Sequence, residues 1–167
     1  MKTLLFRALL LAAAVCTMTS CSPSDSGTVA EDVSAQKSIS YTYNTSELES
    51  MKLINDYRVS IGLNALEKIN YVSVKSDEHD QYMIENNVVN HNDFVARSEE
   101  IMKVFGAKSV SENIAYNYCT PKAALDAWLN SPGHRENIEG DFTHFGIAVR
   151  ENPVNGKKYY TNIFVKI

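Results

Sequence analysis

Three residues of the chain have side chains that bind metals or move protons: His91, Glu112 and His134. They lie in the segments VVNHNDF, SENIA and SPGHRENI. Imidazole nitrogens are good zinc ligands, and a nearby carboxylate can fix the ring tautomer or activate a bound water. The spacings of 21 and 22 residues match no metal-binding motif. The pattern alone therefore leaves open whether the three share one site or are separate surface and core groups.

The chain lacks the motifs of the common enzyme classes. It contains no G-x-S-x-G, H-E-x-x-H, Walker or G-x-G-x-x-G pattern. Of the remaining histidines, we interpret His79 as a packing residue beside the site and expect His144 to be exposed. Cys119 has no activating neighbours in the sequence, so we expect a small buried thiol rather than a nucleophile.

The first 21 residues are typical of a secretion signal. Lys2 and Arg7 precede the apolar run ALLLAAAVC, which is too short to span a bilayer. The segment then ends in MTSC, which resembles the lipobox of bacterial lipoproteins. We predict a lipoprotein signal peptide over 1–21 and membrane anchoring through acylated Cys21. The alternative is an ordinary signal peptide, which would leave the protein secreted.

Residues 22–44 are rich in Ser, Thr and Asp, and they are predicted to form a flexible tether. Residues 45–167 have an ordinary size for one domain with its own core. The formal net charge is −4, and no basic stripe occurs, which argues against nucleic acid as a partner. Of three cysteines, only Cys119 lies in the predicted domain, so no disulfide framework is expected.

Hydrophobic periodicity and end signals predict an α+β fold. Ser46-x-x-Glu49 fits a capping box, Gly62 fits a helix end, and Thr120-Pro121 fits a helix start. Pro132 and Gly133 are expected to end that helix and to turn His134 back toward the site. Helices are expected at 45–61, 70–86, 94–105 and 121–131, and strands at 110–116, 145–150 and 158–167.

These segments together resemble the CAP superfamily, which includes cysteine-rich secretory proteins, antigen 5 and plant pathogenesis-related proteins, and especially its bacterial branch. The matching pieces are LINDYRVSIGLNAL, DEHDQYMIENNVVNH, SENIAY, ALDAWLNSPGHRENIEGDFTHFGIAV and YYTNIFV. The run W-L-N-S-P-G-H-R-x-N-I is the most specific of them. The resemblance implies an α-β-α sandwich, with a small antiparallel sheet between helices and a central cleft lined by two histidines and two glutamates.

Position by position, the resemblance places His91, Glu112 and His134 in that cleft. Ser131 stands where the family has its second glutamate, so the fourth member is absent. The resemblance implies a two-histidine cation site, possible for Zn²⁺, with His91 and His134 as ligands and Glu112 alongside. We expect Asn113 to hydrogen-bond across the cleft. For His79, the alternative to packing beside the cleft is that its side chain lines the cleft.

Three functions remain open from the sequence. The first is a non-enzymatic binding or recognition module of the cell envelope, with a lipid, peptide or protein as ligand. The second is a metal-dependent, peptidase-like hydrolase that uses a water activated by Glu112, with His91 and His134 as the other catalytic residues. The third is a carrier of sterols or fatty acids. The resemblance favours the first, since most members are described as recognition or defence proteins.

Overall fold

The computed structural model describes residues 26–167. The predicted signal peptide and the acylated Cys21 lie outside these residues. The described part contains, in chain order, α1 (Ser26–Lys37), α2 (Thr45–Ser60), β1 (Glu67–Lys68), α3 (Asn70–Asn86), α4 (Phe94–Phe105), β2 (Ser109–Tyr116), α5 (Pro121–Asn130), α6 (Pro132–Glu139), β3 (His144–Glu151) and β4 (Lys158–Lys166). Within the described residues, no helix is both long enough and apolar enough to cross a bilayer.

The four strands form one sheet in the order β1-β3-β4-β2. The β3–β4 hairpin is antiparallel, and β2 pairs antiparallel with the other side of β4. The predicted small antiparallel sheet is therefore present, and the two residues of β1 add a short parallel pairing with β3 at its edge. Two residues are too few to show the alternation by which a strand is recognised in a sequence.

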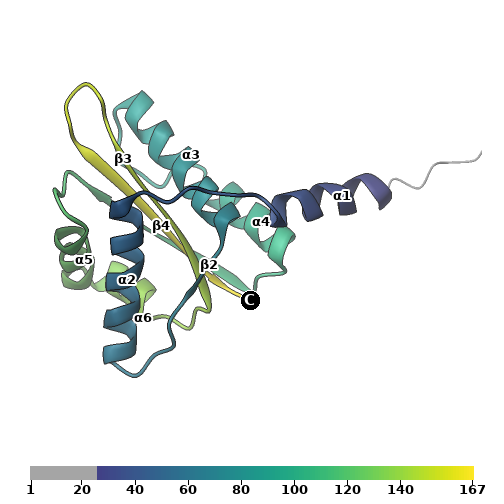
Figure 1. Cartoon of the computed structure of the whole chain (residues 1–167), viewed down its shortest axis with the longest axis horizontal. Helices are drawn as coiled ribbons and strands as arrows, with labels where there is room; N and C mark the ends of the chain where they lie inside the picture. The colour runs from purple at the N-terminus through teal and green to yellow at the C-terminus, as the bar shows by residue number, and fades with distance from the viewer. Residues whose placement is uncertain (1–25) are drawn as a thin grey trace, which may run out of the picture.

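The helices cover both faces of the sheet, which confirms the predicted α-β-α sandwich (Figure 1). Helices α3 and α4 lie on one face, and α2, α5 and α6 lie on the other. Helix α3 packs directly on β3 at Gly146, where a Cβ atom would lie 2.4 Å from the backbone nitrogen of Ser73. A side chain at this position would force the helix away from the sheet.

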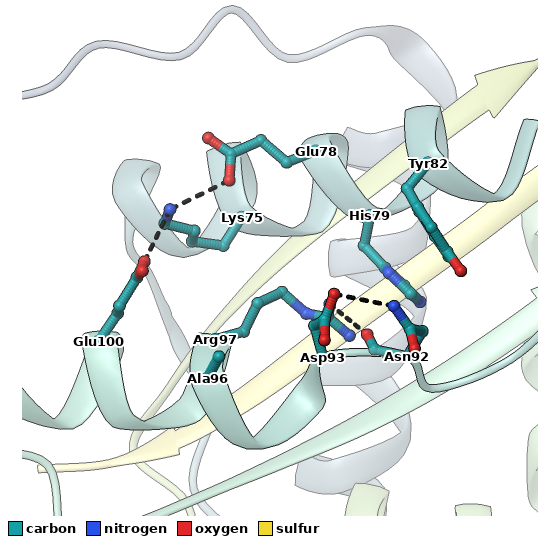
Figure 2. Close-up of a pocket in the computed structure, with 9 residues that line it drawn as sticks. All are labelled: Lys75, Glu78, His79, Tyr82, Asn92, Asp93, Ala96, Arg97 and Glu100. Atoms are coloured by element: carbon teal, nitrogen blue, oxygen red, sulfur yellow. Dashed lines mark hydrogen bonds and ion pairs between the residues drawn. The ribbon is translucent and has the colours of Figure 1, made fainter. Parts of the chain in front are cut away.

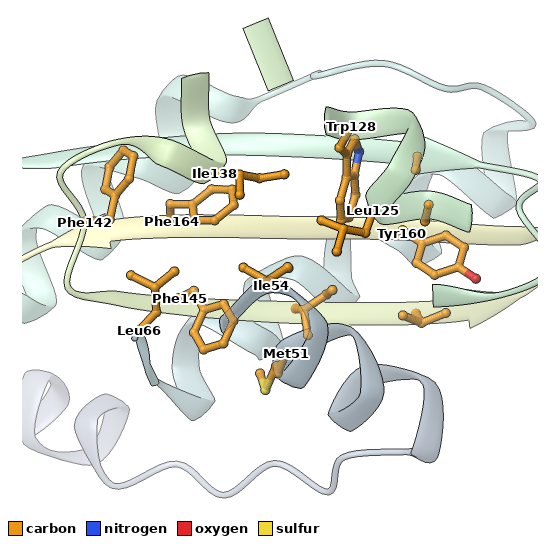
Figure 3. Packing of buried hydrophobic residues seen from close by; sticks show 14 residues of the cluster. Met51, Ile54, Leu66, Leu125, Trp128, Ile138, Phe142, Phe145, Tyr160 and Phe164 are labelled. Carbon is orange, nitrogen blue, oxygen red and sulfur yellow. The ribbon is translucent and has the colours of Figure 1, made fainter. Parts of the chain in front are cut away.

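The two faces of β4 enter different parts of the core, as its alternating pattern predicts. Tyr160 and Phe164 pack with α2, α5 and α6 around Trp128, whose indole N–H donates to the carbonyl of Ile114 at 2.9 Å (Figure 3). Ile163 and Val165 belong to the core on the opposite face, against α3 and α4. Trp128 is therefore a core residue, as expected.

Three local predictions were wrong. Residues 26–37 form helix α1 rather than part of a tether, and Lys37 lies over the ring of Phe105 on α4. Polar composition indicated the tether, but Glu, Ala, Gln and Lys are also good helix formers. Helix α2 is capped by Asn44 with Glu47 rather than by Ser46 with Glu49, because Asn44 is the last extended residue before the helix. Cys119 is exposed rather than buried, in the turn before α5.

A fourth prediction, that Pro132 and Gly133 form a turn after a helix, was also wrong. Pro132 is the first residue of α6, and the chain bends at Ser131, which is extended between α5 and α6. Proline fits the first turn of a helix because its missing N–H has no partner there anyway. His134 therefore lies in the first turn of a helix rather than in a turn that follows one.

Candidate functional site

Glu112 is the buried centre of the predicted site. It lies in the middle of β2, paired with Ile163, and its side chain is 1% exposed. His91 Nδ1 lies 2.8 Å from one of its carboxylate oxygens, so this pair of predicted site residues is in direct contact. The His91 ring itself is about half exposed, at 52%. His91 and Glu112, which are 21 residues apart in the sequence, therefore lie side by side, as the sequence analysis expected.

Arg97 is a third member of this cluster that the sequence analysis missed. Its Nε and Nη2 atoms donate to the Glu112 carboxylate in three contacts of 3.2, 3.1 and 2.9 Å. Its Nη1 donates to the carbonyl of Asn92 at 2.7 Å. Arg97 lies near the start of α4, where the helix dipole disfavours a positive charge. That unfavourable placement is the one local signal that could have drawn attention to it.

His79 supports the segment that carries His91. It is buried on α3, as expected of a packing residue, and its ring stacks on Tyr82 with centroids 5.8 Å apart. Its Nε2 lies 2.8 Å from the carbonyl of Asn90, the residue before His91. Burial lowers the pKa of His79, and the charge of Arg97 lowers it further. Figure 2 shows Arg97 reaching from α4 toward Asn92 and His79.

Asn113 links β2 to the helix that carries His134, on the other face of the strand. Successive strand residues point to opposite faces. Glu112 thus meets α4, while Asn113 is buried against α6 and donates to the backbone carbonyl of His134 at 2.9 Å. Asn137, also on α6, donates to the Asn113 side-chain oxygen at 2.8 Å. The predicted hydrogen bond of Asn113 is present, and Asn137 was not anticipated.

His134 lines a hollow of about 290 Å³ beside this link. Aromatic and aliphatic residues form most of the wall, and Ser131 contributes a hydroxyl; the principal lining residues are Ile114, Tyr116, Tyr118, Trp128, Ser131 and His134. Burial lowers the pKa of His134, and the charge of His91 lowers it further.

A second hollow, of about 310 Å³, lies between α3 and α4. The charged side chains that line it are largely paired with one another. Lys75 contacts Glu78 at 3.0 Å and Glu100 at 2.8 Å, as Figure 2 shows. The hollow at His134 is consequently the more suitable place for an apolar ligand.

His144, predicted to be exposed, is half-buried at the start of β3 and lies outside the predicted site, near Glu67.

The predicted cation site needs enough protein ligands to hold a metal ion. Zinc sites use at least three protein ligands. Within residues 26–167, no group of three or more His, Cys, Asp or Glu side chains is placed to hold a metal ion. Arg97 and His91 already contact both oxygens of Glu112, which leaves only imidazole nitrogens of His91 and His134. The residues do not fit a three-ligand zinc site, and the two-histidine site stays a prediction.

Comparison with known proteins defines the class to which the fold and this cluster belong. A sequence profile described as "CAP: Cysteine-rich secretory protein family" matches residues 51–165. The chain belongs to this family. It is 38% identical over 128 residues to YlbC of Bacillus subtilis, described as an uncharacterised membrane protein, with 73% of this chain aligned.

Two solved structures share the fold. An extracellular SCP-domain protein of Bacillus anthracis superposes with a TM-score of 0.62 at 25% identity, covering 77% of this chain and 45% of that protein. An outer surface protein of Borrelia burgdorferi superposes with a TM-score of 0.60 at 20% identity, covering 77% of this chain and 98% of that protein. This chain spans only 35% of YlbC, so it matches one part of that protein.

Proposed function

We propose that the chain is an exported CAP-domain protein that binds a small, largely apolar ligand without transforming it. The observation that carries the proposal is the bonding of Glu112. Four contacts from Arg97 and His91 reach its two oxygens. An ionised carboxylate has about four lone-pair sites. A general base must accept a proton from the reacting group or from water, and Glu112 has no acceptor site left for it.

The hollow at His134 supports a binding role. Ligand sites are usually apolar concavities with a few polar groups that fix orientation. This hollow has Tyr118 and Trp128 in its wall, with His134 and Ser131 as the polar groups. Its volume of about 290 Å³ is at the lower end of ligand sites, which favours a small ring over a sterol or a long acyl chain.

Indole, a neutral aromatic compound, is a suitable probe for the hollow. We expect indole to cause saturable shifts of the Trp128 and His134 signals in NMR spectra of the full chain. Ala127→Leu should fill the hollow and abolish these shifts, because Ala127 lines it. Ala123→Leu, on the same helix but outside this wall, should leave them unchanged. Equal binding by the two variants would refute the location.

The hydrolase alternative makes an opposite prediction. We expect no turnover of a peptide library by the full chain, with or without added zinc. Turnover that disappears in Glu112→Gln would overturn the non-enzymatic proposal, since it would require a reactive carboxylate. Lipid that copurifies with the protein and is identified by mass spectrometry would instead support the carrier of sterols or fatty acids.

Export and anchoring form the second part of the proposal. The relatives include extracellular and surface proteins, and the sequence MTSC ends in Cys21. We propose that acylated Cys21 holds the domain at a membrane. Growth with an alkyne-labelled fatty acid should label the full chain and leave it in the membrane fraction. Cys21→Ser should remove both the label and the membrane association, and a variant that keeps both would refute anchoring at this residue.

A further inference from the structure

The charge opposite Glu112 comes from the protein itself. Arg97 is 11% exposed and Glu112 is 1% exposed, so their contact is largely removed from water. A buried carboxylate requires a positive partner or several hydrogen-bond donors. A divalent metal is one such partner, and a guanidinium is another. Guanidinium keeps its charge at all physiological pH values, and its planar fork matches the carboxylate.

Arg97 also determines which nitrogen of His91 carries a proton. Because Glu112 is paired with a permanent cation, it is held as the carboxylate and can only accept hydrogen bonds. The contact at 2.8 Å therefore requires that His91 Nδ1 carries the hydrogen and donates it. In the neutral ring the lone pair is then on Nε2, on a side chain that is about half exposed. A ligand that reaches this ring would therefore meet Nε2 as a hydrogen-bond acceptor.

We infer that the Arg97 guanidinium takes the place of a metal ion opposite Glu112, and that it is the positioning residue which fixes the tautomer of His91. The site is then organised without a metal, and His91 offers Nε2 to a hydrogen-bond donor such as a hydroxyl or an amide. This inference goes beyond the proposed function, because it concerns the half-exposed ring of His91 and not the hollow at His134. The asparagine link between β2 and α6 holds His134 independently of it.

Histidine NMR tests the inference on the full chain. Long-range ¹H–¹⁵N spectra distinguish the two neutral tautomers of each ring. We expect His91 to be the Nδ1–H tautomer, with signals unchanged by EDTA or by one equivalent of Zn²⁺. In Arg97→Met the carboxylate loses its cation, so His91 should lose its single tautomer and its signals should respond to Zn²⁺. The melting temperature of this variant should fall by roughly 10 °C, as expected for breaking a buried ion pair.

Arg135→Met is the matched control. Arg135 is on exposed α6 surface, and its Nε donates to the carbonyl of Leu129. This variant should keep the His91 spectrum of the natural chain. Zn²⁺-dependent shifts of the His91 signals in the natural chain would overturn the inference, and so would an unchanged His91 tautomer in Arg97→Met.

If Arg97→Met does not fold, the response of the His91 signals to Zn²⁺ in the natural chain still tests whether the site is organised without a metal. Arg97→Lys then serves as the second variant for the tautomer. A lysine keeps the charge but lacks the fork, so His91 should keep its tautomer only in part. Full retention would contradict the role of the fork. These results are separate from the indole experiment: indole binding can fail while His91 keeps its tautomer, and the reverse is also possible.

Discussion

Arg58 offers the sharpest test of how the fold holds the helix that carries His134. It is fully buried at the end of α2 and has no carboxylate partner among its contacts. Its Nη1 donates to the carbonyls of Ile138 and Gly140 at 2.6 and 2.9 Å, just where α6 ends. Its Nε donates to the carbonyl of Asn64 at 2.9 Å. Arg58 therefore connects the loop after α2 to the end of α6.

We expect Arg58→Met to be strongly destabilising. The substitution keeps an aliphatic chain but removes the donor to the buried contact at the carbonyl of Ile138 and the donors to the partly buried contacts at the carbonyls of Gly140 and Asn64. Each unsatisfied buried acceptor costs about 1–3 kcal/mol. The guanidinium also loses hydration on burial, which lowers the pKa of Arg58, and its removal recovers part of that cost. The net loss in the free energy of unfolding should be about 3–4 kcal/mol.

Urea denaturation measures this loss. With a slope of about 2 kcal/mol/M, the midpoint should fall by roughly 1.5–2 M in Arg58→Met. Arg58→Lys, which keeps the charge but offers three donors without the planar fork, should lose about half as much. Arg135→Met is again the control, because an exposed arginine contributes no more than about 1 kcal/mol. If Arg58→Met and this control agree within about 1 kcal/mol, buried donation to these carbonyls does not determine stability here.

Three other predictions concern packing, protonation and exposure. Gly146→Ala should destabilise the fold by about 3 kcal/mol, because its Cβ would meet the backbone of α3, whereas Gly133→Ala, with open space around it, should stabilise α6 by about 0.5–1 kcal/mol. Thermal unfolding of both variants checks the contrast, which would disappear if α3 were not in contact at Gly146. Burial raises the pKa of Asp80, so the folded state binds its proton more tightly than the unfolded state does. Stability should therefore decline as the pH rises from the ordinary pKa of an aspartate to the raised value, and Asp80→Asn should flatten this decline in urea titrations at several pH values. Cys119 should react stoichiometrically with iodoacetamide in the folded protein, and protection from alkylation would contradict its exposed position.

Most elements could be predicted because their signals are local. The bounds of α3 and α4 agree with the expected ranges 70–86 and 94–105, since apolar spacing and end residues lie within each segment. The alternation of β4 likewise predicted its two faces. Helix α6 was missed because Pro-Gly usually indicates a turn, and the eight residues of α6 are too few for a clear period.

The site could be predicted only in part. His91, Glu112 and His134 were identified, chiefly through resemblance to a family, and the contact between His91 and Glu112 is present. Asn113 was expected to hydrogen-bond across the cleft, and its side chain donates to the backbone carbonyl of His134 on α6. The alternative in which Glu112 activates a water stays a prediction, and it was made without the charge that Arg97 on the neighbouring helix brings to this carboxylate.

The amino-acid sequence by itself determined where the helices and strands lie and which residue types are available for chemistry, because periodicity, caps and turns depend on neighbours along the chain. Tertiary structure decided what Glu112 is bonded to. Arg97 lies 15 residues away and reaches it only because α4 packs across β2. An ion pair of this kind depends on the distance between two elements, and no local pattern encodes that distance.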